Sequence, residues 1–167
     1  MKVILFACFL ILTTSLAYGS DCSYWNTLVD PRAPKVSVAK DSAALKNVLA
    51  GMRCLLKLEG RKERGVRYGQ KAFVSQTVPI ASVEINALYQ ISELFYGNTE
   101  FANALALTDD PPKLVGEFEV EEFDSPVTVK KAFISYRKWF AEVERLGLQT
   151  AREQKLDPLA GSGVKWH

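Results

Sequence analysis

The chain has 167 residues, a formal net charge of +2 and 48% hydrophobic residues. That length suits one domain with a sizeable core. A near-neutral chain has no global electrostatic attraction to nucleic acid or acidic lipid, so the composition argues against a nucleic-acid-binding protein. The single histidine, His167, is the last residue, a poor place for the base of a Ser-His-Asp or Cys-His arrangement.

Residues 1–19 have the three parts of a cleavable signal peptide. A basic residue precedes an apolar run over residues 3–12, and Ala17 and Gly19 place small side chains where a signal peptidase needs them. The run is shorter than the roughly 20 residues that span a bilayer, so we expect cleavage rather than a retained anchor. No second apolar segment of that length follows. The working protein is then expected to begin near Ser20 and to be periplasmic or secreted, with no stable membrane anchor.

Two cysteines remain after the leader is removed. Cys22 and Cys54 form an even pair in an oxidising space, which predicts a disulfide between them. The bridge closes a loop of about 30 residues, a stabilisation on the order of 3 kcal/mol. The alternative is a pair of free, buried thiols.

The segment 20–40 contains two prolines and few periodic apolar positions, so we expect an extended arm. The first strong helix is predicted over residues 41–59. Asp41 is a natural N-cap, the apolar residues recur at the 3, 4, 7 spacing of one helix face, and Gly60 follows the last of them.

A basic connection is expected over residues 61–78. Seven basic residues against two acidic ones give residues 53–71 a net charge of +5. Such a segment suits an acidic partner, an anionic glycan or a phosphate group, but it could also pair within the molecule with the acidic segment 108–124. The candidate partner-binding residues are Arg61, Lys62, Arg64, Arg67 and Tyr68.

A second helix is predicted over residues 80–96, with Pro79 at its start and Gly97 after its end. A short third helix is expected over 100–107. The apolar spacing of Ala87-Leu88-Tyr89-Gln90-Ile91-Ser92-Glu93-Leu94 resembles that of HEAT and armadillo-like helical hairpins over about residues 79–107. The resemblance implies a protein-binding scaffold without catalysis. No repeat of about 40 residues recurs, so an irregular helical bundle is an equal alternative.

The acidic segment 108–124 has a net charge of −6 and contains two prolines, which favours a loop. The alternation over residues 117–121 is also compatible with a short strand, but one isolated strand is marginal.

The fourth helix is predicted from Ser125-Pro126 to about Leu146, because serine at the N-cap and proline at the first helical position are typical of a helix start. One or two further turns are expected over 148–155. The tail 157–167 has turn residues and no helical period, so we expect it to be irregular and docked on the body.

Motifs for metal or phosphate chemistry are missing from the sequence. His and Cys ligands do not cluster and no Gly-rich phosphate loop occurs, so we expect no metal, no cofactor and no catalytic residues. A carboxylate pair for glycoside hydrolysis is conceivable, with ordinary solvated acids the more common case. The carboxylate candidates are Glu84, Glu93, Glu121 and Glu122. The aromatic stripe of the fourth helix is more typical of a core than of a ligand groove, and comprises Phe133, Tyr136, Trp139 and Phe140.

These patterns together predict an all-α, single compact domain of four to five helices. We expect an exported, non-catalytic protein that binds another protein, such as a periplasmic inhibitor or immunity-type protein. The alternatives are a carboxylate-dependent cell-wall hydrolase and a carrier that binds a small apolar ligand among the aromatic residues.

Overall fold

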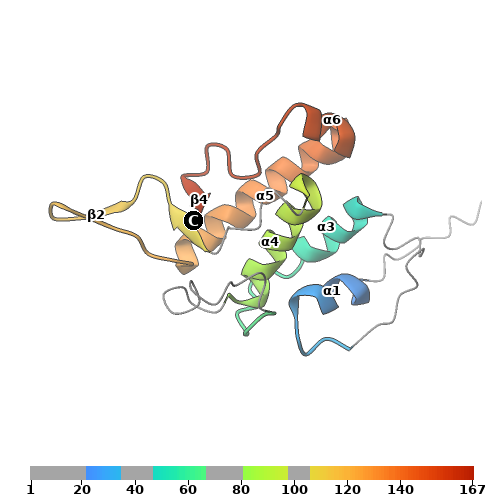
Figure 1. Ribbon diagram of the computed structural model, residues 1–167, viewed down its shortest axis with the longest axis horizontal. Coiled ribbons are helices and arrows are strands. Elements are labelled where there is room, and N and C mark those ends of the chain that lie inside the picture. Colours follow the sequence, from blue (N-terminus) through green and yellow to red (C-terminus); the bar gives the residue numbers. More distant parts are fainter. Residues whose placement is uncertain (1–21, 35–46, 67–80, 98–105) are drawn as a thin grey trace, which may run out of the picture.

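The structure is a computed structural model that describes residues 22–34, 47–66, 81–97 and 106–167. These residues form five helices, which share one apolar core, and two small antiparallel sheets (Figure 1). The prediction of a mainly helical domain is therefore confirmed, whereas the expectation of helices alone is wrong. The signal peptide predicted over residues 1–19 lies outside the described residues.

The elements in chain order are α1 (Ser23–Val29), α3 (Val48–Leu56), α4 (Val83–Tyr96), β1 (Leu107–Asp109), β2 (Lys113–Val115), β3 (Phe118–Val120), α5 (Pro126–Leu146), α6 (Leu148–Glu153) and β4 (Val164–Trp166). None of the helices in the described ranges is long and apolar enough to cross a bilayer.

Helix α1 replaces the first part of the expected extended arm. Trp25 and Val29 lie one helical turn apart and are both buried, so a helix places both side chains on the core. Cys22 at the N-cap is bonded to Cys54 of α3, which fixes where α1 begins. The prediction of extended chain is thus wrong for Ser23–Val29, and residues 35–40 lie outside the described part.

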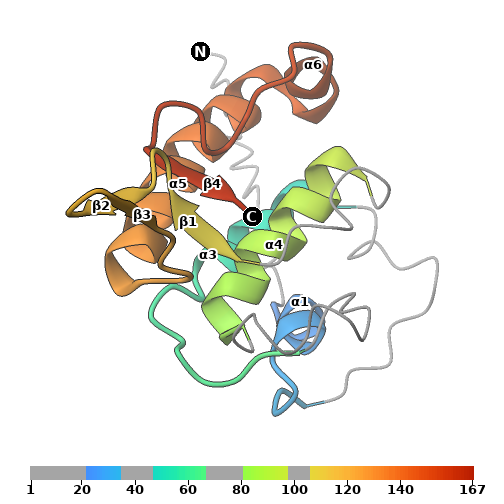
Figure 2. The same cartoon turned by 60° about the vertical axis from the view of Figure 1, so that its left-hand side comes forward.

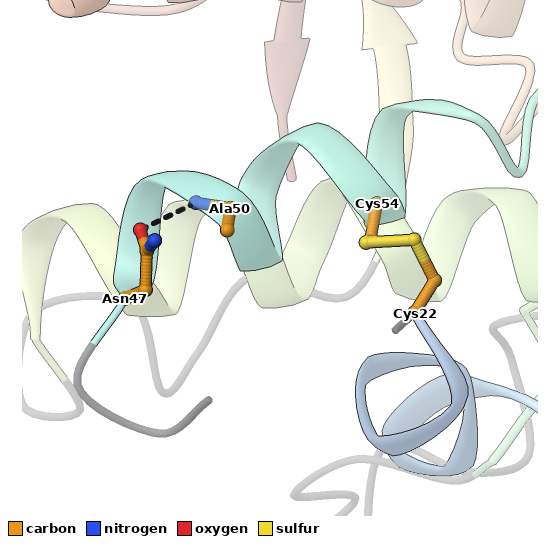
Figure 3. Close-up of a disulfide and its surroundings, with 4 residues drawn as sticks. All are labelled: Cys22, Asn47, Ala50 and Cys54. Carbon is orange, nitrogen blue, oxygen red and sulfur yellow. Dashed lines mark hydrogen bonds between the residues drawn. A yellow bond between two sulfur atoms is a disulfide. The ribbon is translucent and has the colours of Figure 1, made fainter. Parts of the chain in front are cut away.

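The N-cap of helix α3 lies six residues after the predicted N-cap, Asp41. Asn47 caps it, because its side-chain oxygen accepts a hydrogen bond of 3.0 Å from the Ala50 amide (Figure 3). Gly60 follows the helix with a φ of +83°, a conformation that favours glycine. The predicted end is therefore confirmed to within a few residues, and residues 41–46 are not among those described.

Helix α4 is the central element of the core. Every residue from position 83 to position 92 is buried, because α1, α3, α5 and α6 all pack against it. Ser82 caps its first turn and Gly97 ends it, with the Gly97 amide donating to the Glu93 carbonyl at 2.8 Å. The predicted helix 80–96 is confirmed over Val83–Tyr96.

The end of the predicted third helix is a strand. Leu107 begins β1, which pairs with β4 of the tail in the antiparallel register Leu107↔Trp166, Thr108↔Lys165 and Asp109↔Val164. Figure 2 shows the two strands side by side beside α4. The helix expected over 100–107 and the irregular tail are both wrong where they form this sheet. Residues 98–105 are not described, so the HEAT-like hairpin stays a prediction.

Strands β2 and β3 form a hairpin inside the segment predicted to be a loop. Their register pairs Lys113 with Val120, Leu114 with Glu119 and Val115 with Phe118. The two-residue turn starts at Gly116, whose φ of +64° suits a tight hairpin turn. Figure 1 shows the hairpin projecting from the helical body. The loop interpretation of 108–124 is therefore wrong over β1, β2 and β3.

Helix α5 follows the sequence prediction closely. The Ser125 hydroxyl accepts from the Thr128 amide at 3.2 Å, Pro126 occupies the first turn, and Gly147 ends the helix with a φ of +85°. The aromatic stripe lies in the core, as expected. Helix α6 confirms the additional turns predicted after Gly147.

A chain of hydrogen bonds docks the tail on the core. The Trp166 indole N–H donates to the Tyr136 hydroxyl at 2.9 Å, and that hydroxyl is also bonded to Ser92 Oγ. Ser92 in turn donates to the Leu88 carbonyl at 3.1 Å, within α4. The expectation that the tail is docked is therefore confirmed.

Candidate functional site

Exposed apolar side chains gather on the β2–β3 hairpin. Large hydrophobic residues whose exposed fraction lies between 42% and 76% occur at six positions in the described part of the chain: Leu114, Val115, Phe118, Val120, Val127 and Ile134. The first four belong to the hairpin. A cluster of this kind on a projecting element is typical of an interaction site, whereas scattered single residues need no explanation.

The hairpin presents both of its faces to solvent. Because directly paired residues of an antiparallel sheet share a face, Val115, Phe118 and Val120 lie on one face, with Leu114 and Glu119 on the other. All six strand residues are exposed, so neither face packs on the body. Phe118 is the most exposed of the six apolar side chains, at 76%.

Acidic residues surround these apolar side chains. Four glutamates against Lys113 give residues 113–122 a net charge of −3. Glu117 and Glu119 form no ion pair with the described residues, whereas Glu121 lies 3.6 Å from His167 Nδ1. We call residues 113–122 the acidic hairpin.

The base of the acidic hairpin is held firmly. The Asp124 amide donates to the Leu107 carbonyl and the Leu107 amide donates to Asp124 Oδ1, both at 2.8 Å, which closes the chain between β1 and α5 into a loop. Two ion pairs reinforce the base: Asp109 with Lys131 at 3.0 Å, and Asp110 with Lys165 at 3.6 Å. The hairpin therefore projects from a fixed support.

Asp124 is the most perturbed acid of this base. Burial raises the pKa of its carboxyl to about 6, although the Leu107 hydrogen bond opposes the shift. Its Oδ2 atom is buried and has no hydrogen-bond partner among the described residues. The Asp124 side chain thus accepts a hydrogen bond that supports the base of the hairpin, and its burial disfavours the charged form.

The remaining exposed apolar residues lie on the outer side of α5. Val127 and Ile134 are seven residues apart, with Lys130 and Lys138 continuing the same stripe at helical spacing. Neither lysine has an ion-pair partner in the described part of the chain, and residues 126–141 contain four basic residues and no acidic one. We call Val127, Lys130, Ile134 and Lys138 the basic α5 face.

The predicted basic connection is described only in part. Arg67 and Tyr68 lie outside the described residues, whereas Arg61, Lys62 and Arg64 form part of a segment held against the start of α4. The Val83 amide donates to the Glu63 carbonyl at 2.8 Å, and the Gly65 amide donates to the Ala81 carbonyl at 3.0 Å.

Arg61 is the least available of the predicted binding residues. Its guanidinium pairs with Asp30 at 2.8 Å and with Glu63 at 3.0 Å. Burial alone would raise the pKa of Asp30, but hydrogen bonds from Arg32 and the charges of both arginines bring it below its usual value. Lys62 and Arg64 are exposed and make no ion pair with the described residues. Within the described part of the chain, no ion pair neutralises their charges.

Lys62 adjoins the basic α5 face. It lines a surface pocket of about 280 Å³ together with Lys130 and Glu84. Three acids of the 108–124 segment are paired, but with other residues: Asp109 with Lys131, Asp110 with Lys165 and Glu121 with His167. The pairing of the two oppositely charged segments within one molecule therefore has no support in the described part of the chain.

Two of the candidate carboxylates, Glu84 and Glu93, do not form a close pair. Glu84 and Glu93 are nine residues apart on α4, about 14 Å along the axis. Glu84 accepts from the Gly60 amide at 2.7 Å, a structural role. Burial raises the pKa of Glu93, and the Gln90 hydrogen bond partly offsets the shift. Glu121 and Glu122 are exposed just beyond β3.

The aromatic stripe lies in the core. Phe133 and Tyr136 are fully buried, Trp139 and Phe140 nearly so, and none of them borders the surface pockets of 280–540 Å³ found among the described residues. The described residues also contain no group of three or more His, Cys, Asp or Glu placed to hold a metal ion.

The predicted disulfide is present. Cys22 and Cys54 are bonded, with Cα atoms 5.4 Å apart, and the bridge joins α1 to α3 (Figure 3). A disulfide of this kind is typical of an oxidising compartment outside the cytoplasm.

The hairpin was missed at the level of sequence, although a signal for it exists. Two short runs ending in apolar residues flank Gly116-Glu117, and a two-residue turn that starts with glycine is typical of a hairpin. The basic α5 face was not predicted, because Val127 and Ile134 fall outside the apolar core stripe of that helix.

Comparisons with known proteins give no family. No protein-family model matches the chain, and neither the curated proteins nor the solved structures yield a match.

Proposed function

We propose that this chain is an exported, non-catalytic protein-binding module whose acidic hairpin is the binding element. The observation that carries the proposal is the exposure of four large apolar side chains on a projecting hairpin. Exposed apolar area lowers solubility, and its burial under a partner contributes favourable free energy to binding.

The hairpin suits a partner that encloses it. Aromatic residues on rigid elements are favoured anchors at protein interfaces, and Phe118 lies beside a tight turn on a supported base. A periplasmic inhibitor or immunity-type protein that inserts the hairpin into a partner enzyme is the concrete form of this proposal. The disulfide is consistent with such a location.

The two alternatives receive less support from the described residues. A cell-wall hydrolase needs two carboxyls about 5 to 10 Å apart across a cleft, and the Glu84–Glu93 separation along α4 exceeds that range. A carrier needs an apolar cavity, and the aromatic stripe fills the core instead.

An affinity experiment tests the proposal. The 20–167 chain, the variant Val115→Thr/Phe118→Ser and the control Gln149→Ser/Gln154→Ser on α6 and just after it serve as baits for an envelope extract of cells that produce the protein. All four substituted side chains are exposed, so the three baits should unfold at the same temperature.

Recovery of one protein in stoichiometric amount by the unmodified and control baits, and not by the hairpin variant, is the expected result. Equal recovery by all three baits would place the binding surface elsewhere. Recovery of no protein by any bait would refute the module.

A further inference from the structure

We infer that the acidic hairpin of one copy docks on the basic α5 face of a second copy, and that two copies do so reciprocally in a two-fold dimer. The inference rests on the proposed function, because it takes the hairpin to be a protein-binding element and names its partner. Four observations on the described residues carry it.

The first observation is the distribution of exposed apolar side chains. All six large ones in the described residues belong to only two surfaces, the acidic hairpin and the basic α5 face. Val127 and Ile134, one above the other along α5, offer an apolar strip on which Phe118 and Val115 can pack. The exposed apolar area of each surface thus finds cover on the other.

The second observation is charge. The hairpin has a net charge of −3, and residues 126–141 of α5 contain four basic residues and no acid. Two of the four, Lys131 and Arg137, are paired with Asp109 and Glu59. Glu117 and Glu119 lack ion-pair partners among the described residues, and so do Lys130 and Lys138. Opposite charges around matched apolar centres fix the orientation of a complex and disfavour contacts between like surfaces, such as hairpin with hairpin.

The third observation extends the basic surface. Lys62 lines the same pocket as Lys130, together with Glu59 and Glu84, so the exposed part of the basic connection adjoins the α5 face. The acidic partner that the sequence predicts for Lys62 is then a segment of the same protein, in another molecule.

The fourth observation concerns whether the hairpin packs on α5 of its own molecule. The strand residues of the hairpin are exposed on both faces, and Val127 and Ile134 are exposed as well. The hairpin therefore does not cover its own α5. Two such contacts, related by a two-fold axis, bury both hairpins and give a closed dimer rather than an open-ended polymer.

The decisive experiment uses charge reversal on the two surfaces and sedimentation velocity as the readout. Variant A is Glu117→Lys/Glu119→Lys, and variant B is Lys130→Glu/Lys138→Glu. A matched control, Gln149→Lys/Glu153→Lys/Gln154→Lys, raises the net charge by the same amount as variant A but lies on α6 and just after it, away from both surfaces. All proteins are measured as the 20–167 chain over a concentration series at about 50 mM salt.

The unmodified chain and the control should sediment as concentration-dependent dimers. A and B should each be monomeric, since both of their contacts join like charges. An equimolar mixture of A and B should recover the dimer, because each hairpin then meets an α5 face of opposite charge. The recovery also shows that both variants are folded.

A monomeric unmodified chain would overturn the inference, as would dimers of A and B that are as stable as the unmodified one, or a mixture that stays monomeric. These failures leave the proposed function standing if the hairpin bait still recovers a different protein. A monomeric chain whose hairpin recovers nothing would refute both.

Discussion

Asp124 is a single side chain whose charge opposes folding. Its pKa of about 6 in the folded chain lies above the ordinary value near 3.9, so the folded state binds this proton more tightly than the unfolded state does. The contribution of Asp124 to the free energy of unfolding is therefore most favourable below about pH 4. It is lost as the pH rises towards 6, by at most about 3 kcal/mol.

Asp124→Asn should remove this pH dependence. The amide oxygen still accepts from the Leu107 amide, and asparagine tolerates the φ of +54° at this position. Urea unfolding at pH 4, 5, 6 and 7 should show a smaller decrease in stability for the variant than for the unmodified chain. The exposed control Glu153→Gln should leave the decrease unchanged. An equal decrease in Asp124→Asn would mean that another group is responsible.

Gly51 is a second residue whose substitution should destabilise the fold, because a larger side chain has no room there. A Cβ atom at this position would lie 2.5 Å from Cε2 and Cζ2 of the Trp25 ring, which packs on α3 from α1. Gly51→Ala should therefore lower the free energy of unfolding by about 1–3 kcal/mol. Combining it with Trp25→Leu should cost less than the sum of the two single changes, since the clash is gone. Strict additivity in urea unfolding would show that the two residues do not meet.

At the scale of elements, the disulfide secures α1. The helix has seven residues and is too short to be stable by itself, so its position depends on the bridge and on the burial of Trp25 and Val29. Cys22→Ala/Cys54→Ala should lower the free energy of unfolding by about 3–4 kcal/mol for a sequence separation of 32 residues.

Reduction provides the internal control for this prediction. A reductant should destabilise the unmodified chain by a similar amount and leave the double variant unchanged. Two free thiols in the unreduced, unfolded protein would contradict the bridge itself.

Local signals in the sequence predicted the elements that depend on local interactions. Ser125-Pro126 and Gly147 bound α5 in the sequence and in the structure, and Gly97 ends α4 in both. The buried stripe of α5 followed from its period, because burial of an apolar face needs no knowledge of what covers it. The disulfide was predictable from the expected export to an oxidising space and from the even number of cysteines that remain after the leader.

The elements that were missed depend on distant parts of the chain. Strand β1 exists because β4, more than fifty residues away, supplies its hydrogen bonds, and nothing near Leu107 reveals that partner. Helix α1 forms against α3 and the disulfide. The candidate site was missed for a related reason, because apolar residues such as Phe118 predict burial and only the three-dimensional arrangement reveals that nothing covers them.

At the scale of the whole molecule, the binding element that we propose lies outside the core. The core unites the helices with the docked tail, while the acidic hairpin projects from it and contributes no strand residue to the core. Substitutions at the hairpin tip should therefore change the unfolding free energy by less than about 0.5 kcal/mol while abolishing association. A large loss of stability in Val115→Thr/Phe118→Ser, measured by urea unfolding, would contradict this separation.

Site-specific photo-crosslinking in the producing cells tests the hairpin as a protein-binding element most directly. A benzoyl-phenylalanine is placed at Phe118, or at the exposed Gln149 of α6 as the control, and adducts are identified by mass spectrometry after irradiation. We predict a protein adduct from position 118 that is weak or missing from position 149, and we expect residues of the basic α5 face of a second copy among its crosslinked sites. Equal labelling from the two positions, or no protein adduct from position 118, would contradict the account.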